Sequence, residues 1–111
     1  MSIEQKIKIQ LKDLILDLVN GDYKKVILDG RNGGMPESVM IQIFKEYQGT
    51  ITFPPNDAFS KLDICKITDS NRYSIVFDLW VDNQPSDLSL MCNAIQEDEN
   101  IKIEIEDIHV L

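Results

Sequence analysis

Hydrophobic and polar residues alternate along the second half of the chain, and this period of two predicts strands. The first stretch, residues 73–81, has one hydrophobic and one mixed set of positions, and 87–95 and 101–110 follow it as further strands. Short polar connections at 82–86 and 96–100 separate the three. Because Pro85 cannot donate to a ladder, we expect 82–86 to be a hairpin loop and the strands to form an antiparallel meander. One face of the first strand then carries Tyr73, Ile75, Phe77, Leu79 and Val81, and the other carries Ser74, Val76, Asp78, Trp80 and Asp82.

The first half of the chain instead has helical periodicity. Hydrophobic residues recur at helical spacing over 3–19, and Asn20-Gly21 ends this amphipathic helix. Asp22 is expected to cap a short helix that ends at Gly30. A third helix is predicted over 36–47, where it would cover the sheet beside the first. The glycine-rich segment 29–34 is predicted to be a linker, since no lysine follows it as in a phosphate-binding loop.

Two weaker strand signals and one irregularity complete the pattern. Residues 50–53 are compatible with a short edge strand, and 62–68 alternate imperfectly, as in a first or edge strand. The hydrophobic phase shifts after Ile105, which predicts a bulge near Glu106 and Asp107. The expected fold is a single α+β domain over 1–111, with N-terminal helices packed on a curved antiparallel sheet of about four strands. Cystatin-like and nuclear-transport-factor-like cones share this order of elements, although order alone says little about function.

The charge distribution changes the picture of what the chain can bind. The net charge is -8, and residues 1–53 hold equal numbers of acids and bases, so the excess of acids lies entirely in 54–111. Nucleic acid is therefore excluded as a direct ligand, because phosphates are bound by clustered Lys and Arg, and a basic partner is favoured. The alternative explanation is that the acidic loops only keep the protein soluble. No hydrophobic run reaches the roughly 18 to 20 residues of a membrane span, and the charged N-terminal helix does not resemble a secretion signal, so we expect a cytoplasmic protein with no membrane partner.

Few residues are candidates for chemistry. His109 is the only histidine, and Asp107 precedes it by two positions, as in a pair that orients a general base. Since the sequence places no serine or cysteine beside this pair, we predict no catalytic residue. The acidic run 97–99 has neither EF-hand nor His/Cys spacing, so no metal or cofactor is expected. Cys65 and Cys92 are expected to be buried, reduced thiols.

A binding surface is the stronger candidate. Trp80 shares its strand face with Asp78 and Asp82, and an aromatic residue among carboxylates is typical of a protein-binding hot spot. Alternatively, Trp80 fills a concave pocket or a second core. We expect neighbouring strands and loops to join further carboxylates into one electronegative patch. The predicted partner-binding set is Asp78, Trp80, Asp82, Asp87, Glu97, Asp98, Glu99, Glu104 and Glu106.

Three segments carry a resemblance to a known group of proteins. Residues 77–80 (FDLW), 86–90 (SDLSL) and 106–111 (EDIHVL) resemble a family of small uncharacterised bacterial proteins with a DLW...SDLxL...DIHVL pattern. That pattern has a glycine and a basic residue before its SDL step, where this chain has Gln84-Pro85, and it carries over no catalytic residue. In size, acidity and composition the chain also resembles the immunity proteins of bacterial toxin systems, including contact-dependent growth inhibition.

These observations support two hypotheses from different classes. In the first, the chain is an immunity protein that performs no chemistry and neutralises a cognate toxin domain, a basic nuclease, through its acidic sheet face and loops. In the alternative, it binds a small ligand or is an enzyme, with Tyr73, Asp78, Trp80 or His109 lining the concave cavity of a cone-like fold. A buried cavity with convergent polar groups would favour the alternative, and an open acidic surface favours the inhibitor.

Overall fold

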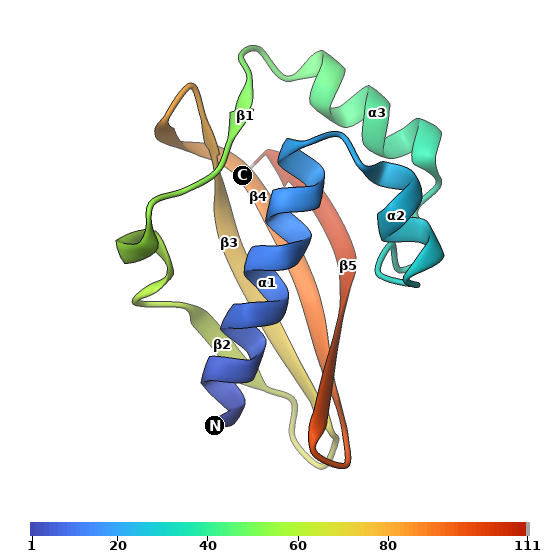
Figure 1. Cartoon of the computed structure of the whole chain (residues 1–111), viewed down its shortest axis with the longest axis vertical. Helices are drawn as coiled ribbons and strands as arrows, with labels where there is room; N and C mark the ends of the chain where they lie inside the picture. The colour runs from blue at the N-terminus through green and yellow to red at the C-terminus, as the bar shows by residue number, and fades with distance from the viewer. Residues whose placement is uncertain (111) are drawn as a thin grey trace.

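The computed structural model describes residues 1–110, which form a five-stranded antiparallel sheet with helices on one side (Figure 1). The strands are β1 (Ile51–Thr52), β2 (Asp63–Lys66), β3 (Arg72–Val81), β4 (Gln84–Glu97) and β5 (Asn100–Val110). Their order is β1-β3-β4-β5. Both β1 and β2 pair with the edge of β3 that faces away from β4, β1 near the end of β3 and β2 near its start. This confirms the α+β class and the predicted meander of the three long strands.

Helix α1 (Ile3–Val19) crosses the inner face of the sheet and supplies the helical side of the core (Figure 1). Its start is defined by a capping box, in which the Ser2 hydroxyl accepts from the Gln5 N–H at 3.1 Å and the Gln5 side chain accepts from the Ser2 N–H. Side chains that recur on one face of the helix are completely buried: Ile7, Leu11, Leu14 and Ile15.

Helices α2 (Tyr23–Leu28) and α3 (Glu37–Glu46) lie beside α1 near β5 (Figure 1). The prediction that α3 covers the sheet beside α1 is wrong, because α3 packs chiefly against α2. The rings of Tyr23 and Phe44 stack with centroids 6.0 Å apart, and Met40 is the only fully buried residue of α3. The four-residue 3₁₀ helix Asn56–Phe59 connects β1 to β2 and buries Phe59 in the core.

The two faces of β3 are separated as the alternation predicts. Ile75 and Leu79 are completely buried and Phe77 is 6% exposed, whereas Asp78 on the opposite face is exposed. Phe77 also stacks on Phe59, with ring centroids 5.0 Å apart. The hydrophobic face of the meander therefore packs against α1.

Both hairpin loops are shorter than predicted. Val81 pairs with Gln84, so only Asp82 and Asn83 form the first turn, with φ angles of 51° and 63°. Asp and Asn tolerate this left-handed conformation better than most residues, which permits a two-residue turn. Pro85 accordingly lies in β4, and it is accommodated because β5 pairs with β4 only from Leu88 onward, leaving Pro85 without a neighbour on that side.

The predicted bulge near Glu106 and Asp107 is confirmed. Met91 pairs with Asp107 and Cys92 pairs with Ile105, so Glu106 is the extra residue in β5. The inserted residue moves the later hydrophobic positions of β5 back toward the core, and Ile108 is 3% exposed.

The two cysteines differ in burial. Both are free, and Cys92 is completely buried as expected, but the expectation is wrong for Cys65, which is exposed. Cys65 lies on β2, a short strand that packs few residues into the core. Within residues 1–110, no helix is both long enough and sufficiently hydrophobic to cross a membrane.

Candidate functional site

The face of the sheet opposite α1 is the candidate site. In the part of the chain that the structure describes, no helix packs on this face (Figure 1). Strand alternation and register place there the even-numbered residues of β3 and their partners on the neighbouring strands. We call this surface the open sheet face, and it consists of Thr52, Asp63, Cys65, Arg72, Ser74, Val76, Asp78, Trp80, Pro85, Ser89, Met91, Asn93, Ile95, Lys102, Glu104, Asp107 and His109.

Carboxylates outnumber cations on this surface. Asp63 and Asp78 are exposed and form no ion pair with any residue from 1 to 110. Glu104 lies 3.9 Å from the guanidinium of Arg72, so its charge is partly balanced at that end of the sheet. The carboxylates of Asp63 and Asp78 are therefore available to a cationic group of a partner.

A groove of about 500 Å³ runs along the β3 edge of the open sheet face. Its walls combine apolar surface from Trp80 and Val76 with the carboxylates Asp63 and Asp78, and Lys61 supplies its one cation. Trp80 is half-buried, so its indole retains contact area for a partner. The predicted pairing of Trp80 with Asp78 is thus present, in a groove that is open to solvent.

The Asp107 and His109 side chains approach each other as the sequence suggested. Asp107 Oδ2 lies 2.9 Å from His109 Nδ1, but the contact lacks hydrogen-bond geometry. The structure also places Ser89 opposite His109, which the sequence could not show. Its hydroxyl is fully buried and makes no hydrogen bond to His109.

The remaining predicted site residues do not form one patch. Asp82 and Asp87 lie near the β3–β4 hairpin, whereas 97–99 form the β4–β5 hairpin at the opposite end of the sheet (Figure 1). The expectation that sheet pairing joins both loops is therefore wrong, because the whole length of β4 separates them. Glu106 is exposed at the bulge.

Asp82 and Asp87 also have partners within the chain. Asp82 Oδ1 accepts from the Thr50 N–H at 3.0 Å and so ties β1 to the hairpin. Asp87 accepts from the Tyr47 hydroxyl, and this hydrogen bond raises the pKa of Tyr47 above its ordinary value. These two carboxylates serve the connection between α3, β1 and the sheet.

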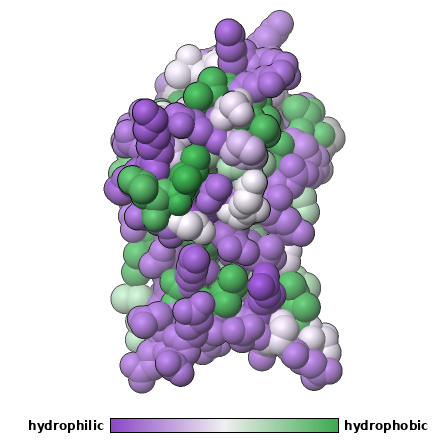
Figure 2. Space-filling view, turned by 90° about the vertical axis from the view of Figure 1, so that its right-hand side faces the viewer, coloured by the Kyte–Doolittle hydropathy of each residue, from purple (hydrophilic) through white to green (hydrophobic). Residues whose placement is uncertain are grey.

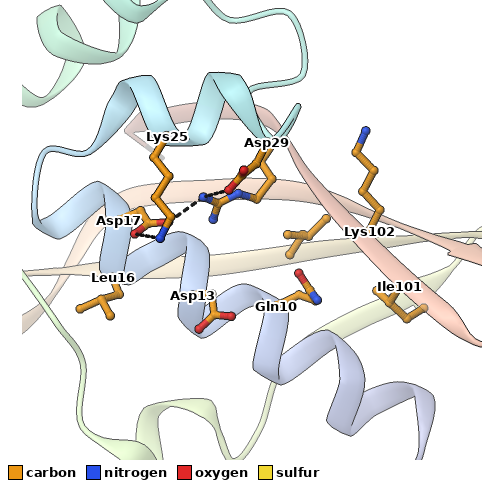
Figure 3. A pocket seen from close by; sticks show the side chains of 10 residues that line it. Gln10, Asp13, Leu16, Asp17, Lys25, Asp29, Ile101 and Lys102 are labelled. Carbon is orange, nitrogen blue, oxygen red and sulfur yellow. Dashed lines mark hydrogen bonds and ion pairs between the residues drawn. The ribbon is translucent and has the colours of Figure 1, made fainter.

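The opposite edge of the sheet contains a cluster of charged residues that sequence reasoning missed (Figure 3). Arg31 Nη2 contacts Asp17 Oδ2 at 2.6 Å and Asp29 Oδ2 at 2.9 Å, and the Arg31 and Asp17 side chains are 9% and 8% exposed. Lys25 Nζ lies 3.4 Å from Asp17 Oδ1. In Figure 3 Lys102 lies on the opposite side of the pocket from Asp17. The cluster lines a pocket of about 410 Å³ between α1 and β5.

This cluster has a structural explanation. The Arg31 carbonyl accepts the Ile105 N–H at 2.7 Å, so the same residue binds the edge of β5 and the buried carboxylate of α1. Asp17 follows Leu14 by three positions and so lies beside the hydrophobic stripe of α1. This position was the one feature of the sequence that could have indicated a buried carboxylate. Arg31 gave no signal, because it stands in a segment whose glycines indicated a linker.

The side of the molecule formed by α2, α3 and β5 offers no comparable apolar surface. Figure 2 shows hydrophobic residues there in separate groups within a mostly hydrophilic surface. Within residues 1–110, side chains of α1 fill the inner face of the sheet. Of the residues that the alternative hypothesis places in one cavity, Tyr73 lines a different pocket from Asp78 and Trp80.

The chain belongs to the family described as a domain of unknown function, DUF7668, whose model matches residues 15–111. Comparison with curated proteins and with solved structures gave no match. The function is therefore argued from the geometry of the open sheet face.

Proposed function

We propose that this protein is an immunity protein that binds and neutralises a cognate bacterial toxin domain, a basic nuclease, through the open sheet face. The observation that carries the proposal is the half-buried indole of Trp80 beside the unpaired carboxylates Asp63 and Asp78, in a groove open to solvent. Aromatic anchors beside desolvated charges supply much of the binding energy of protein interfaces.

The charge of the chain supports the same partner. An inhibitor with a net charge of -8 is attracted to a basic nuclease over distances of about a Debye length, which speeds association. A carboxylate-rich surface also competes directly with phosphate for the cations of a nuclease site. In this mechanism the immunity protein needs no catalytic residue, cofactor or metal, and it acts in the cytoplasm, where the toxin would reach nucleic acid.

The test is coexpression with the product of the neighbouring gene, followed by measurement of growth and of affinity. We expect the protein to restore growth and to form a stoichiometric complex whose association slows as salt rises. Trp80→Ala should weaken the complex by about 2 kcal/mol, roughly thirtyfold.

Asp98→Asn provides the matched control, because Asp98 is an exposed carboxylate on the distant β4–β5 hairpin. It should leave growth rescue intact and change the affinity less than threefold or so. Circular dichroism of both variants verifies that they are folded. Failure to bind or neutralise the neighbouring gene product would reject the immunity proposal, and equal losses from Trp80→Ala and Asp98→Asn would reject the open sheet face as the docking surface.

A further inference from the structure

The edge of β3 is interrupted beside the groove. β2 pairs with β3 only as far as Val76, and β1 begins to pair at Trp80. Asp78 therefore stands between them with no strand on that side. The gap spans too little of β3 to accept another strand, and the groove of about 500 Å³ lies beside it.

The backbone of Asp78 points into this gap. The Asp82 N–H donates to the Thr50 carbonyl at 2.8 Å, and the Arg72 carbonyl accepts from the Ile67 N–H at 2.9 Å, so the even-numbered residues of β3 direct their backbone groups toward this edge. Asp78 has the same parity, and its carbonyl pairs with no backbone or side-chain group of residues 1–110. An acceptor is thus available at the open stretch of the β3 edge, beside the groove that Asp78 lines.

The groove that Asp78 lines also contains a second carboxylate, that of Asp63, and the Trp80 indole. Asp63 pairs with Val76, which makes Asp63 and Asp78 diagonal neighbours roughly 7–8 Å apart across the strands. Trp80 follows Asp78 by two positions on the same face, about 7 Å along the strand. Lys61 leaves the groove with a net formal charge of -1.

On the premise of the proposed function, we propose that this groove is the socket for an arginine side chain of the toxin. A guanidinium carries five N–H donors in one plane, so it can donate to the two carboxylates and to the Asp78 carbonyl while its face lies on the Trp80 indole. A lysine ammonium is a compact point charge and cannot make the planar stacking contact together with divergent hydrogen bonds. The partner residue is therefore defined by shape as well as by charge.

The test uses N-acetyl-arginine amide as the probe, titrated into the isotope-labelled full-length protein and followed by NMR. We expect saturable shifts of the Trp80 indole N–H and of the Asp78 amide, with a dissociation constant that is roughly millimolar for so small a probe. N-acetyl-citrulline amide, which has nearly the same shape without the charge, should bind much more weakly.

Substitutions then examine the individual contacts. The double variant Asp63→Asn/Asp78→Asn should weaken binding of the arginine probe by roughly three- to tenfold, and Lys61→Met should strengthen it by removing the competing cation. Asp69→Asn and Asp98→Asn are matched controls, because both alter exposed carboxylates outside the groove at left-handed positions that Asn also tolerates. They should leave binding unchanged.

Several results would overturn the socket. These are equal shifts with the citrulline probe, shifts located away from the groove, or unchanged binding in the double variant. The two proposals also fail separately. If Trp80→Ala abolishes toxin binding while Asp63→Asn/Asp78→Asn leaves it intact, the immunity function stands and the socket is wrong. If the arginine probe binds the groove but no toxin is neutralised, the groove is an arginine site whose partner is not a toxin, and the immunity function is wrong.

Discussion

The carboxylates at the two edges of the sheet differ in whether they have a cationic partner. At β5, the buried Asp17 carboxylate is paired with Arg31 at 2.6 Å, and the Arg31 carbonyl also closes the strand edge at Ile105. At β3, the carboxylates of Asp63 and Asp78 have no cationic partner within residues 1–110, and the edge between β1 and β2 stays open. The difference suggests a criterion for choosing residues to test, because a carboxylate without an internal partner is a better candidate for binding another protein than one chosen by its position in an acidic stretch.

Closing the β5 edge also has a protective effect. An exposed edge strand presents unpaired backbone groups on which another chain can pair. The Arg31 segment covers β5 at Ile105, and Ile103 beside it is completely buried. The open part of β3 is too short for a strand of another chain to pair with it.

The largest expected effect comes from breaking the closed edge at Arg31. Arg31→Met leaves the buried Asp17 carboxylate with only the exposed Lys25 as a partner, and should lower the free energy of unfolding by about 3 kcal/mol, measured by urea denaturation. Arg72→Met is the matched control, since its 3.9 Å contact with Glu104 is partly exposed, and should cost about 0.5 kcal/mol or less. Equal losses from the two variants would contradict the distinction between the edges. The double variant Asp17→Leu/Arg31→Met should recover part of the loss.

A somewhat smaller effect is expected from Gly33→Ala. An added Cβ would lie 1.8 Å from the Ile105 carbonyl oxygen, and Gly33 has a φ of +58°, so the Arg31 segment must move away from β5. We expect a loss of about 2 kcal/mol. Gly34→Ala separates the two causes, because Gly34 also has a positive φ but nothing lies within 4 Å of its added Cβ. We expect Gly34→Ala to lower the free energy of unfolding by about 1 kcal/mol, from backbone strain alone. The additional loss in Gly33→Ala would then come from the close approach to β5.

The smallest expected effect is on the pH dependence of stability and comes from the two thiols. Cys92 lies in the core, whereas Cys65 lies on β2 beside the open edge. Burial, assisted by the charge of Glu106, raises the pKa of the Cys92 thiol far above its ordinary value of 9.0. Above pH 9.0 the unfolded chain loses this proton while the folded chain keeps it. The free energy of unfolding should therefore fall as pH rises, by up to about 1.4 kcal/mol per pH unit from this group.

Denaturation at pH 8, 9 and 10 measures this slope. Cys92→Ala should lower stability at every pH by removing core volume but should reduce the alkaline slope, whereas Cys65→Ala should leave the slope unchanged. At pH 8 a thiol reagent should label Cys65 in the native protein and reach Cys92 only on unfolding. An unchanged slope in Cys92→Ala would show that other groups control the alkaline loss of stability.

Local sequence was sufficient for the layers of the fold. Residues at alternate positions of a strand must point to opposite faces, so the hydrophobic set of β3 identified the buried face before any neighbour was known. The phase shift after Ile105 likewise predicted the bulge, because one inserted residue reverses which positions face the core. The same periodicity placed Trp80 and Asp78 together on the other face.

Only the tertiary structure decided which charged residues meet. Whether β1 and β2 leave a gap beside Asp78, and whether Arg31 reaches Asp17 fourteen positions earlier, depends on how separate elements pack in space. Sequence reasoning treated the acidic loops as neighbours because they are joined by adjacent strands, yet strand length carries them to opposite ends of the sheet. The periodicity of the sequence thus determined which face of each strand is buried. Long-range packing determined the edges of the sheet, the ion-pair partners and the position of the groove.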